Sequence, residues 1–150
     1  MDARILALSY LICWGCKSEK QRVLRWDFPQ QQWIYPDTLW GELPITEPAA
    51  CRTLELQIQL EELYPWRNLY LLAFLESPDG FRTQSRLELV FSDSLGRWYD
   101  SDRAFETVIA QRLSLGTAGV YRIGLLPYIR SDTVVGIRRI ALHAYPCSSE

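Results

Sequence analysis

A strict alternation of apolar and polar side chains is the feature that most constrains how this chain folds. In the run RTLELQIQLEEL, which begins at Arg52, Leu or Ile occupies every second position and Glu or Gln fills most of the others. In a β-strand, side chains two residues apart point to the same face. The run therefore predicts a strand with one face on a hydrophobic core and the other in solvent.

Several further segments have the composition of strands. Apolar runs at 23–28, 68–76, 86–91, 120–126 and 133–145 are separated by turns rich in Gly, Pro, Asp and Ser. Segment 103–115 fits a short helix as well as a strand, and its neighbours favour the strand. Because no alternation of strands with helices occurs, we expect one all-β domain over residues 23–150. Its expected architecture is an antiparallel β-sandwich, either jelly-roll-like or immunoglobulin-like.

The N-terminal residues have the pattern of an export signal. An apolar run from Ile5 to Trp14 is too short to span a bilayer, which takes about 20 residues. A glycine and Cys16 follow, and then a polar stretch. A small residue before a cysteine at the end of such a run is typical of bacterial lipoproteins. We expect residues 1–15 to be a signal peptide, Cys16 a lipidated membrane anchor and residues 16–22 a tether; the alternative is a buried N-terminal strand or helix.

The composition argues against several functional classes. Sixteen basic and eighteen acidic residues give a net charge of −2, which offers no basic excess for binding nucleic acid. The single histidine, His143, lies in a predicted strand without a nucleophile motif nearby, and no metal-binding or phosphate-binding motif occurs. We therefore expect no enzyme, no cofactor and no metal site. Cys51 and Cys147 either form a disulfide outside the cytoplasm or remain two free thiols.

Aromatic side chains are abundant in this chain. Trp33, Tyr35 and Trp40 lie in the stretch 30–48, which several prolines interrupt. One hypothesis is that these three side chains form a platform for a sugar or a protein partner. The other is that the stretch is a loop folded over the edge of the sandwich.

A series of short motifs follows the predicted strands in a definite order. In chain order they are Tyr64-Pro65-Trp66-Arg67-Asn68-Leu69-Tyr70, then Asp93, Gly96 and Trp98, then Gly119 and Tyr121, then Arg130, and finally Gly136-Ile137. Together with Cys16, this order resembles the gliding motility lipoprotein GldH family of Bacteroidota. The resemblance implies a non-enzymatic lipoprotein, anchored in the inner or outer membrane of the cell envelope. Its implied partners are other envelope proteins of the gliding and associated secretion apparatus.

The first motif also has a physical interpretation. Pro65 cannot donate a ladder hydrogen bond, so it is expected at the edge or start of a strand. The segment around it should turn the chain from the alternating strand into strand 68–76, with the side chains of Arg67 and Asn68 bonding to the backbone of the turn. The motif is then a signature of the fold or a partner-binding element. A second hypothesis for the whole chain is an exported carbohydrate-binding sandwich in which Trp33, Trp40 or Trp98 stacks on a glycan.

Overall fold

A computed structural model describes residues 22–148. The predicted signal peptide, the lipidation site Cys16 and the tether up to residue 21 lie outside the described residues, and Arg22 is already the first residue of a strand. The described part of the chain forms ten strands, which are β1 (Arg22–Asp27), β2 (Gln32–Ile34), β3 (Leu39–Ile45), β4 (Ala50–Leu60), β5 (Asn68–Glu76), β6 (Arg82–Val90), β7 (Ala104–Leu115), β8 (Gly119–Pro127), β9 (Thr133–Val135) and β10 (Ile137–Pro146). Within residues 22–148 no helix is long and apolar enough to cross a membrane.

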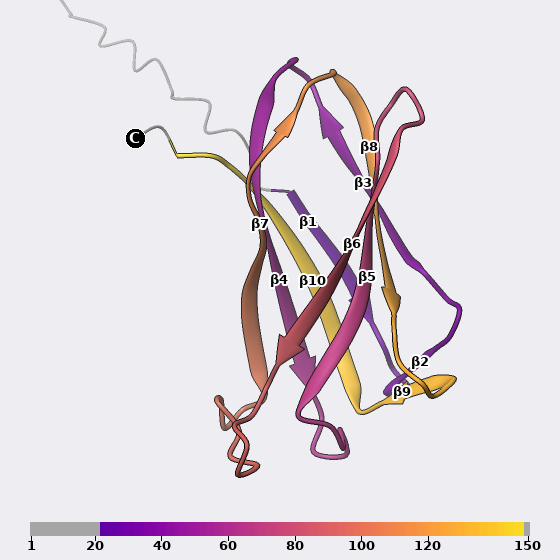
Figure 1. The fold of residues 1–150 in the computed structure, drawn as a ribbon, viewed down its shortest axis with the longest axis vertical. Helices are drawn as coiled ribbons and strands as arrows, with labels where there is room; N and C mark the ends of the chain where they lie inside the picture. The colour runs from indigo at the N-terminus through magenta and orange to yellow at the C-terminus, as the bar shows by residue number, and fades with distance from the viewer. Residues whose placement is uncertain (1–21, 149–150) are drawn as a thin grey trace, which may run out of the picture.

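Two four-stranded antiparallel sheets face each other in this structure (Figure 1). The first sheet has the strand order β1-β10-β4-β7, and the second sheet has the order β3-β8-β5-β6. The short strands β2 and β9 pair with each other at one end of the molecule. The expected all-β sandwich is confirmed.

The pairing of the eight long strands distinguishes between the two expected types of sandwich. The first long strand pairs with the last (β1 with β10), the second with the seventh (β3 with β8), the third with the sixth (β4 with β7), and the two middle ones (β5 and β6) with each other. This nesting describes a long hairpin wrapped into two sheets, which is the arrangement of a jelly roll. Among the strands of residues 22–148, only β5 and β6 form a simple hairpin of consecutive long strands, so the fold is not immunoglobulin-like.

Most predicted strands lie where the sequence placed them, and segment 103–115 is confirmed as the strand β7. Two expectations need correction. The run 133–145 is two strands, β9 and β10, because Gly136 between them has a φ of +81° and turns the chain toward new partners. The stretch 30–48 is not a simple loop, because it contains β2 and β3.

The core between the two sheets follows the alternation in the sequence. In β4, Leu54, Leu56, Ile58 and Leu60 are each at most 5% exposed, whereas the intervening side chains lie on the partly exposed outer face. The second sheet contributes buried side chains such as Leu71 of β5 to the same cluster. The period of two therefore predicted correctly which face of β4 is buried.

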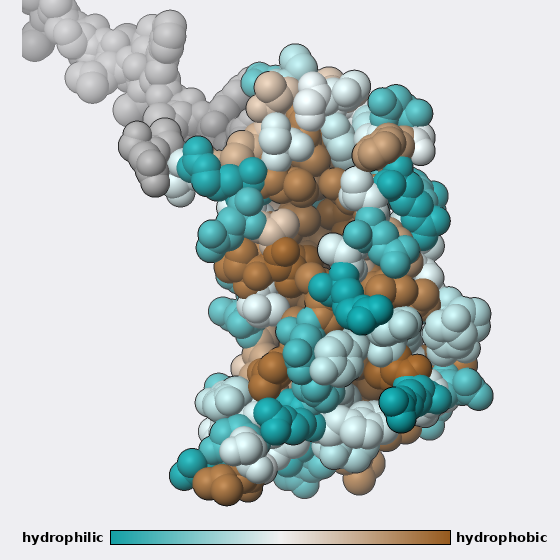
Figure 2. Space-filling view, viewed as in Figure 1, coloured by the Kyte–Doolittle hydropathy of each residue, from teal (hydrophilic) through white to brown (hydrophobic). Residues whose placement is uncertain are grey.

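One side of the sandwich is less well covered than the others. The edge strands β6 and β7 are not paired with each other, and apolar side chains between them are only partly buried, including Leu87, Ile109 and Leu113. They line a small cavity of about 110 Å³. Figure 2 shows apolar surface in the hollow between these two strands.

A disulfide joins Cys51, near the start of β4, to Cys147, just after β10. Their Cα atoms are 5.4 Å apart, and the backbone N–H of Cys147 donates to the carbonyl of Cys51 over 3.2 Å. Of the two alternatives left open by the sequence, the structure has the bonded pair. The bond fastens the last strand to the middle of the first sheet.

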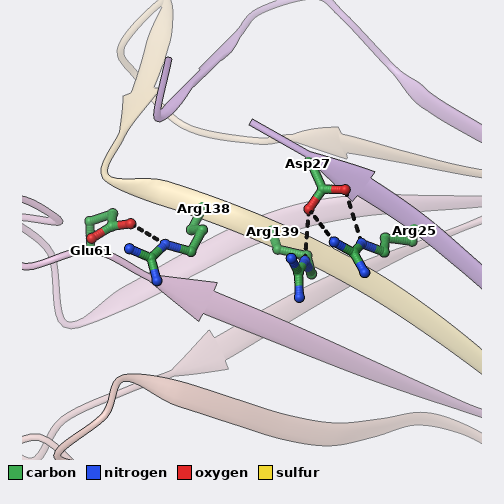
Figure 3. Close-up of polar contacts among 5 residues, drawn as sticks. All are labelled: Arg25, Asp27, Glu61, Arg138 and Arg139. Atoms are coloured by element: carbon green, nitrogen blue, oxygen red, sulfur yellow. Dashed lines mark hydrogen bonds and ion pairs between the residues drawn. The ribbon is translucent and has the colours of Figure 1, made fainter. Parts of the chain in front are cut away.

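Ion pairs cross the outer face of the first sheet near the end at which β1 and β4 finish (Figure 3). Asp27 accepts hydrogen bonds from Arg25 at 2.9 Å and from Arg139 of β10 at 2.7 Å. The hydrogen bond from Arg25, followed by that from Arg139, lowers the pKa of the Asp27 carboxyl. Glu61 pairs with Arg138 in the same way. Because all of these groups are partly or largely exposed, they fix local geometry more than they stabilise the fold.

Candidate functional site

A groove of about 750 Å³ opens on the second sheet, at the end where β5 begins and β8 ends. We call it the aromatic groove. Three stretches of chain that are distant in sequence line it. The β4–β5 turn and β5 contribute Tyr64, Trp66, Asn68 and Tyr70, and β6 contributes Arg86. The segment after β8 contributes Tyr128, Ile129, Arg130 and Ser131. The first of the family-like motifs therefore lines the groove together with Arg130.

The buried side chain of Tyr64 holds the base of the aromatic groove. It is 2% exposed, and its hydroxyl donates a hydrogen bond to the carbonyl of Asn68 over 2.7 Å. Burial raises the pKa of this phenol well above its usual range. The turn does lead from β4 into β5 as predicted, but the bond that fixes it comes from Tyr64. The side chain of Asn68 bonds instead to Glu88 of β6, so this part of the prediction was wrong.

The last motif, Gly136-Ile137, packs directly beneath the first motif, Tyr64–Tyr70. A Cβ atom added to Gly136 would lie 2.5 Å from the backbone nitrogen of Tyr64, so only glycine allows this approach. The neighbouring residue Ile137 is fully buried, as is Leu69 of the first motif at 1% exposure. The glycine of the last motif is therefore required by the packing of the first.

A series of aromatic rings in contact connects the groove to Trp98, which belongs to the motif of Asp93, Gly96 and Trp98. Trp66 meets Tyr64 edge to face with centroids 5.5 Å apart, and Tyr64 meets Phe91 in the same manner at 5.5 Å. Phe105 of β7 then lies 4.8 Å from Phe91 and 6.2 Å from Trp98. The rings run through the edge of the core, so Trp98 stabilises the fold rather than lining the groove.

The loop that contains Asp93 and Gly96 is organised by its own hydrogen bonds. One carboxylate oxygen of Asp93 accepts from the backbone N–H groups of Leu95 and Arg97, each over 2.9 Å. The bond from the Arg97 backbone is the largest cause of the lowered pKa of Asp93. Gly96 adopts a φ of +77° in this turn. These residues shape a turn and do not reach the groove.

Two other motif residues lie outside the groove. The hydroxyl of Tyr121 donates to the carbonyl of Thr117 over 3.0 Å and so closes the connection between β7 and β8. Gly119, with a φ of +138°, leaves space for Pro78, whose ring atoms would lie 2.7 Å from an added Cβ. Both positions are explained by the fold alone.

The polar groups of the aromatic groove are arranged by the pairing of β5 with β6. Tyr70 lies opposite Glu88, and the Tyr70 hydroxyl donates to that carboxylate over 3.0 Å. The amide of Asn68 donates to the same oxygen over 2.8 Å. The bond from Asn68 and then that from Tyr70 lower the pKa of Glu88, and the bond to Glu88 raises the pKa of Tyr70.

Three of the lining rings are open to solvent. Trp66 is 39% exposed, Tyr70 38% and Tyr128 48%. The guanidinium of Arg86 lies 4.7 Å from the centre of the Tyr128 ring, and the backbone N–H of Tyr128 donates to the carbonyl of Tyr70 over 2.8 Å. The sequence alone did not single out Arg86 or Tyr128, because their place in the groove depends on the pairing of β5 with β6 and with β8.

The three aromatic residues of stretch 30–48 do not form an exposed platform. Trp33 is 2% exposed, and its indole N–H donates to the carbonyl of Asp37 over 2.7 Å. Trp40 stacks on Phe74, and arginines lie over its ring. Only Tyr35, 49% exposed, is open to solvent. The proposed sugar-stacking tryptophans are therefore engaged in the fold.

Among residues 22–148, no three His, Cys, Asp or Glu side chains gather closely enough to hold a metal ion. His143 is half-buried in β10, and its ring stacks at 6.0 Å on that of Tyr145.

Comparison with known families agrees with the motif order. A family model described as GldH lipoprotein matches residues 25–143, from within β1 to within β10. The chain belongs to the GldH lipoprotein family. All motifs from Tyr64 to Ile137 lie inside the matched region, whereas Cys16 precedes it. Membership in a lipoprotein family supports anchoring in a membrane of the cell envelope.

Other comparisons add little to this assignment. No curated protein matches the chain. Among solved structures, that of the Gx strain of infectious bursal disease virus is similar with a TM-score of 0.38 and 11% identity, covering 99% of this chain and 39% of the viral one. The VP2 protein of the same virus gives a TM-score of 0.38 and 12% identity over 96% and 40% of the two chains. The chain thus spans about two fifths of the length of these viral chains.

Proposed function

We propose that this chain is a non-enzymatic lipoprotein of the gliding-motility and associated secretion machinery that docks other envelope proteins. Membership in the GldH lipoprotein family supports the process and the membrane anchor. The docking role is supported by the aromatic groove, which is lined by the exposed rings of Trp66, Tyr70 and Tyr128. Cys16 is the anchor in this proposal.

The main support for the docking role is that the motif Tyr64–Tyr70 contains both buried and exposed large side chains. Tyr64 and Leu69 are buried and are explained by the fold. Trp66 and Tyr70, by contrast, expose more than a third of their surface. Large aromatic side chains at exposed positions of a groove are typical of the residues that dominate protein interfaces.

The position of the aromatic groove suits a membrane-anchored protein. Arg22, where the described chain begins, pairs with Ala144 of β10, which in turn pairs with Leu54 of β4. The groove lies beyond Leu60, the last residue of β4, which is about 20 Å further along the strand than Leu54 at the usual rise per residue. In Figure 1, β1 begins away from the end of the molecule at which β5 begins, so an anchor that precedes β1 is compatible with a partner in the groove.

A complementation experiment tests this function. Cells that glide and lack their own copy of the protein receive either the wild-type chain or a variant with Trp66→Ser and Tyr70→Ser. We expect the variant to accumulate in membranes at the normal level but to lose surface spreading. Val108→Ser is the matched control, because Val108 is 45% exposed on the edge strand β7, away from the groove. If the double variant spreads like wild type, the docking role of the groove is wrong.

A further inference from the structure

The cationic side chains of the aromatic groove are not neutralised by the protein. Arg86 and Arg130 line the groove, and among the described residues no carboxylate pairs with either of them. The Arg86 guanidinium instead lies over the ring of Tyr128 and donates one long hydrogen bond of 3.5 Å to the Tyr128 hydroxyl, which leaves its other N–H groups available. Because the lining contains two guanidinium groups and no carboxylate, it carries a net positive charge.

The residues that line the groove include two arginines and no Asp or Glu. Glu88 accepts from both Asn68 and Tyr70 through one carboxylate oxygen. The hydroxyl of Ser131 donates to the carbonyl of Thr133. What remains available is dominated by the donors of Arg86 and Arg130. A donor-rich groove is complementary to a ligand that offers acceptors, and carboxylates match guanidinium geometry with two parallel bonds.

Apolar surface surrounds these donors. The exposed parts of Trp66, Tyr70 and Tyr128, together with the half-buried Ile129, line the groove. A ligand that fits must therefore carry apolar groups next to its negative charge. A volume of about 750 Å³ is within the range of sites that hold a ligand of several residues.

We propose that the aromatic groove binds a short segment of a partner protein in which an acidic side chain is flanked by aromatic or aliphatic ones. The carboxylate pairs with Arg86 or Arg130, and the apolar neighbours pack on Trp66, Tyr70 and Tyr128. This inference rests on the proposed docking function and names the chemistry of the partner.

Two other ligand classes fit the groove less well. A neutral sugar presents hydroxyls that need acceptors as well as donors, and no Asp or Glu is among the residues that line the groove. A phosphate group alone would use the arginines but would leave the aromatic rings without a contact. Charge and apolar surface together favour an acidic peptide segment.

A peptide selection followed by titration tests the proposal. The full-length protein, purified in detergent, selects binders from a displayed library of random heptapeptides, and the most enriched peptide is labelled and titrated by fluorescence anisotropy. We expect enrichment of Asp or Glu beside aromatic or aliphatic residues. Replacing that acid by its amide, or introducing Arg86→Gln or Arg130→Gln, should weaken binding about tenfold or more. Arg22→Gln, which changes an exposed arginine of β1 in the first sheet, is the matched control and should change nothing.

Other outcomes overturn the inference. They are the absence of enriched peptides, enrichment without acidic residues, binding that both arginine variants retain, and displacement by inorganic phosphate or maltohexaose at constant ionic strength. The spreading assay separates this inference from the docking function. If the Trp66 and Tyr70 variant loses spreading while Arg86→Gln and Arg130→Gln spread normally and keep the peptide, docking stands and the acidic partner is wrong. If the aromatic variant spreads normally, docking itself is wrong.

Discussion

Gly136→Ala is the substitution for which the structure gives the sharpest expectation. Gly136 has a φ of +81°, in the left-handed region where an L-residue costs about 1–2 kcal/mol. The added Cβ would also lie 2.5 Å from the nitrogen and 2.6 Å from the Cα of Tyr64. These are backbone atoms that cannot rotate away, so overpacking should cost about 1–3 kcal/mol more. We expect the free energy of unfolding to fall by about 2–5 kcal/mol.

Gly80→Ala separates the two contributions to this loss. Gly80 has a φ of +88°, and nothing lies within 4 Å of the Cβ that alanine would add. The free energy of unfolding of the Gly80→Ala variant should therefore fall by only about 1–2 kcal/mol, the cost of the left-handed backbone conformation. Chemical denaturation of both variants, followed by tryptophan fluorescence on identical preparations, measures the difference. Equal losses in the two variants would refute the close approach of Gly136 to Tyr64.

Three further predictions concern the disulfide, the groove and the anchor. Replacing Cys51 and Cys147 by serine should lower the free energy of unfolding by up to about 4.7 kcal/mol, because the bond joins residues 96 apart and this is the chain-entropy value for a loop of roughly 100 residues. An unchanged denaturation midpoint would contradict this expectation. Glu88→Gln should lower the pKa of Tyr70, because the bond to the carboxylate favours the protonated phenol. Titration of ring-labelled tyrosine by NMR checks this, and an unmoved Tyr70 would count against the bond. Cys16→Ala should release the protein from the membrane fraction, and a variant that still sediments like wild type would exclude lipidation at Cys16.

Local patterns in the sequence predicted much of the fold. The alternation in β4 identified both the strand and its buried face, because side-chain direction in a strand depends only on the parity of the position. The motif Tyr64–Tyr70 was placed correctly at the turn into β5 because Pro65 interrupts a strand ladder. The family was also identified from motif order, and the family match confirms it.

The sequence was less informative where one residue type has two roles. Trp33 and Trp66 are both tryptophans in proline-containing segments, yet the first is buried and the second exposed. Their difference depends on which strands cover them. Likewise, Gly136 lies inside an apolar run that resembles one strand, and its positive φ divides the run into β9 and β10.

By itself, then, the sequence determined the all-β class, most strand positions and the buried face of β4, because these follow from contacts between near neighbours. Only the tertiary structure decided the jelly-roll order, the Cys51–Cys147 bond and the aromatic groove. Each joins residues far apart along the chain, as when Asp27 of β1 pairs with Arg139 of β10. Such pairings are selected by how whole sheets bury their apolar faces, so no local pattern specifies them.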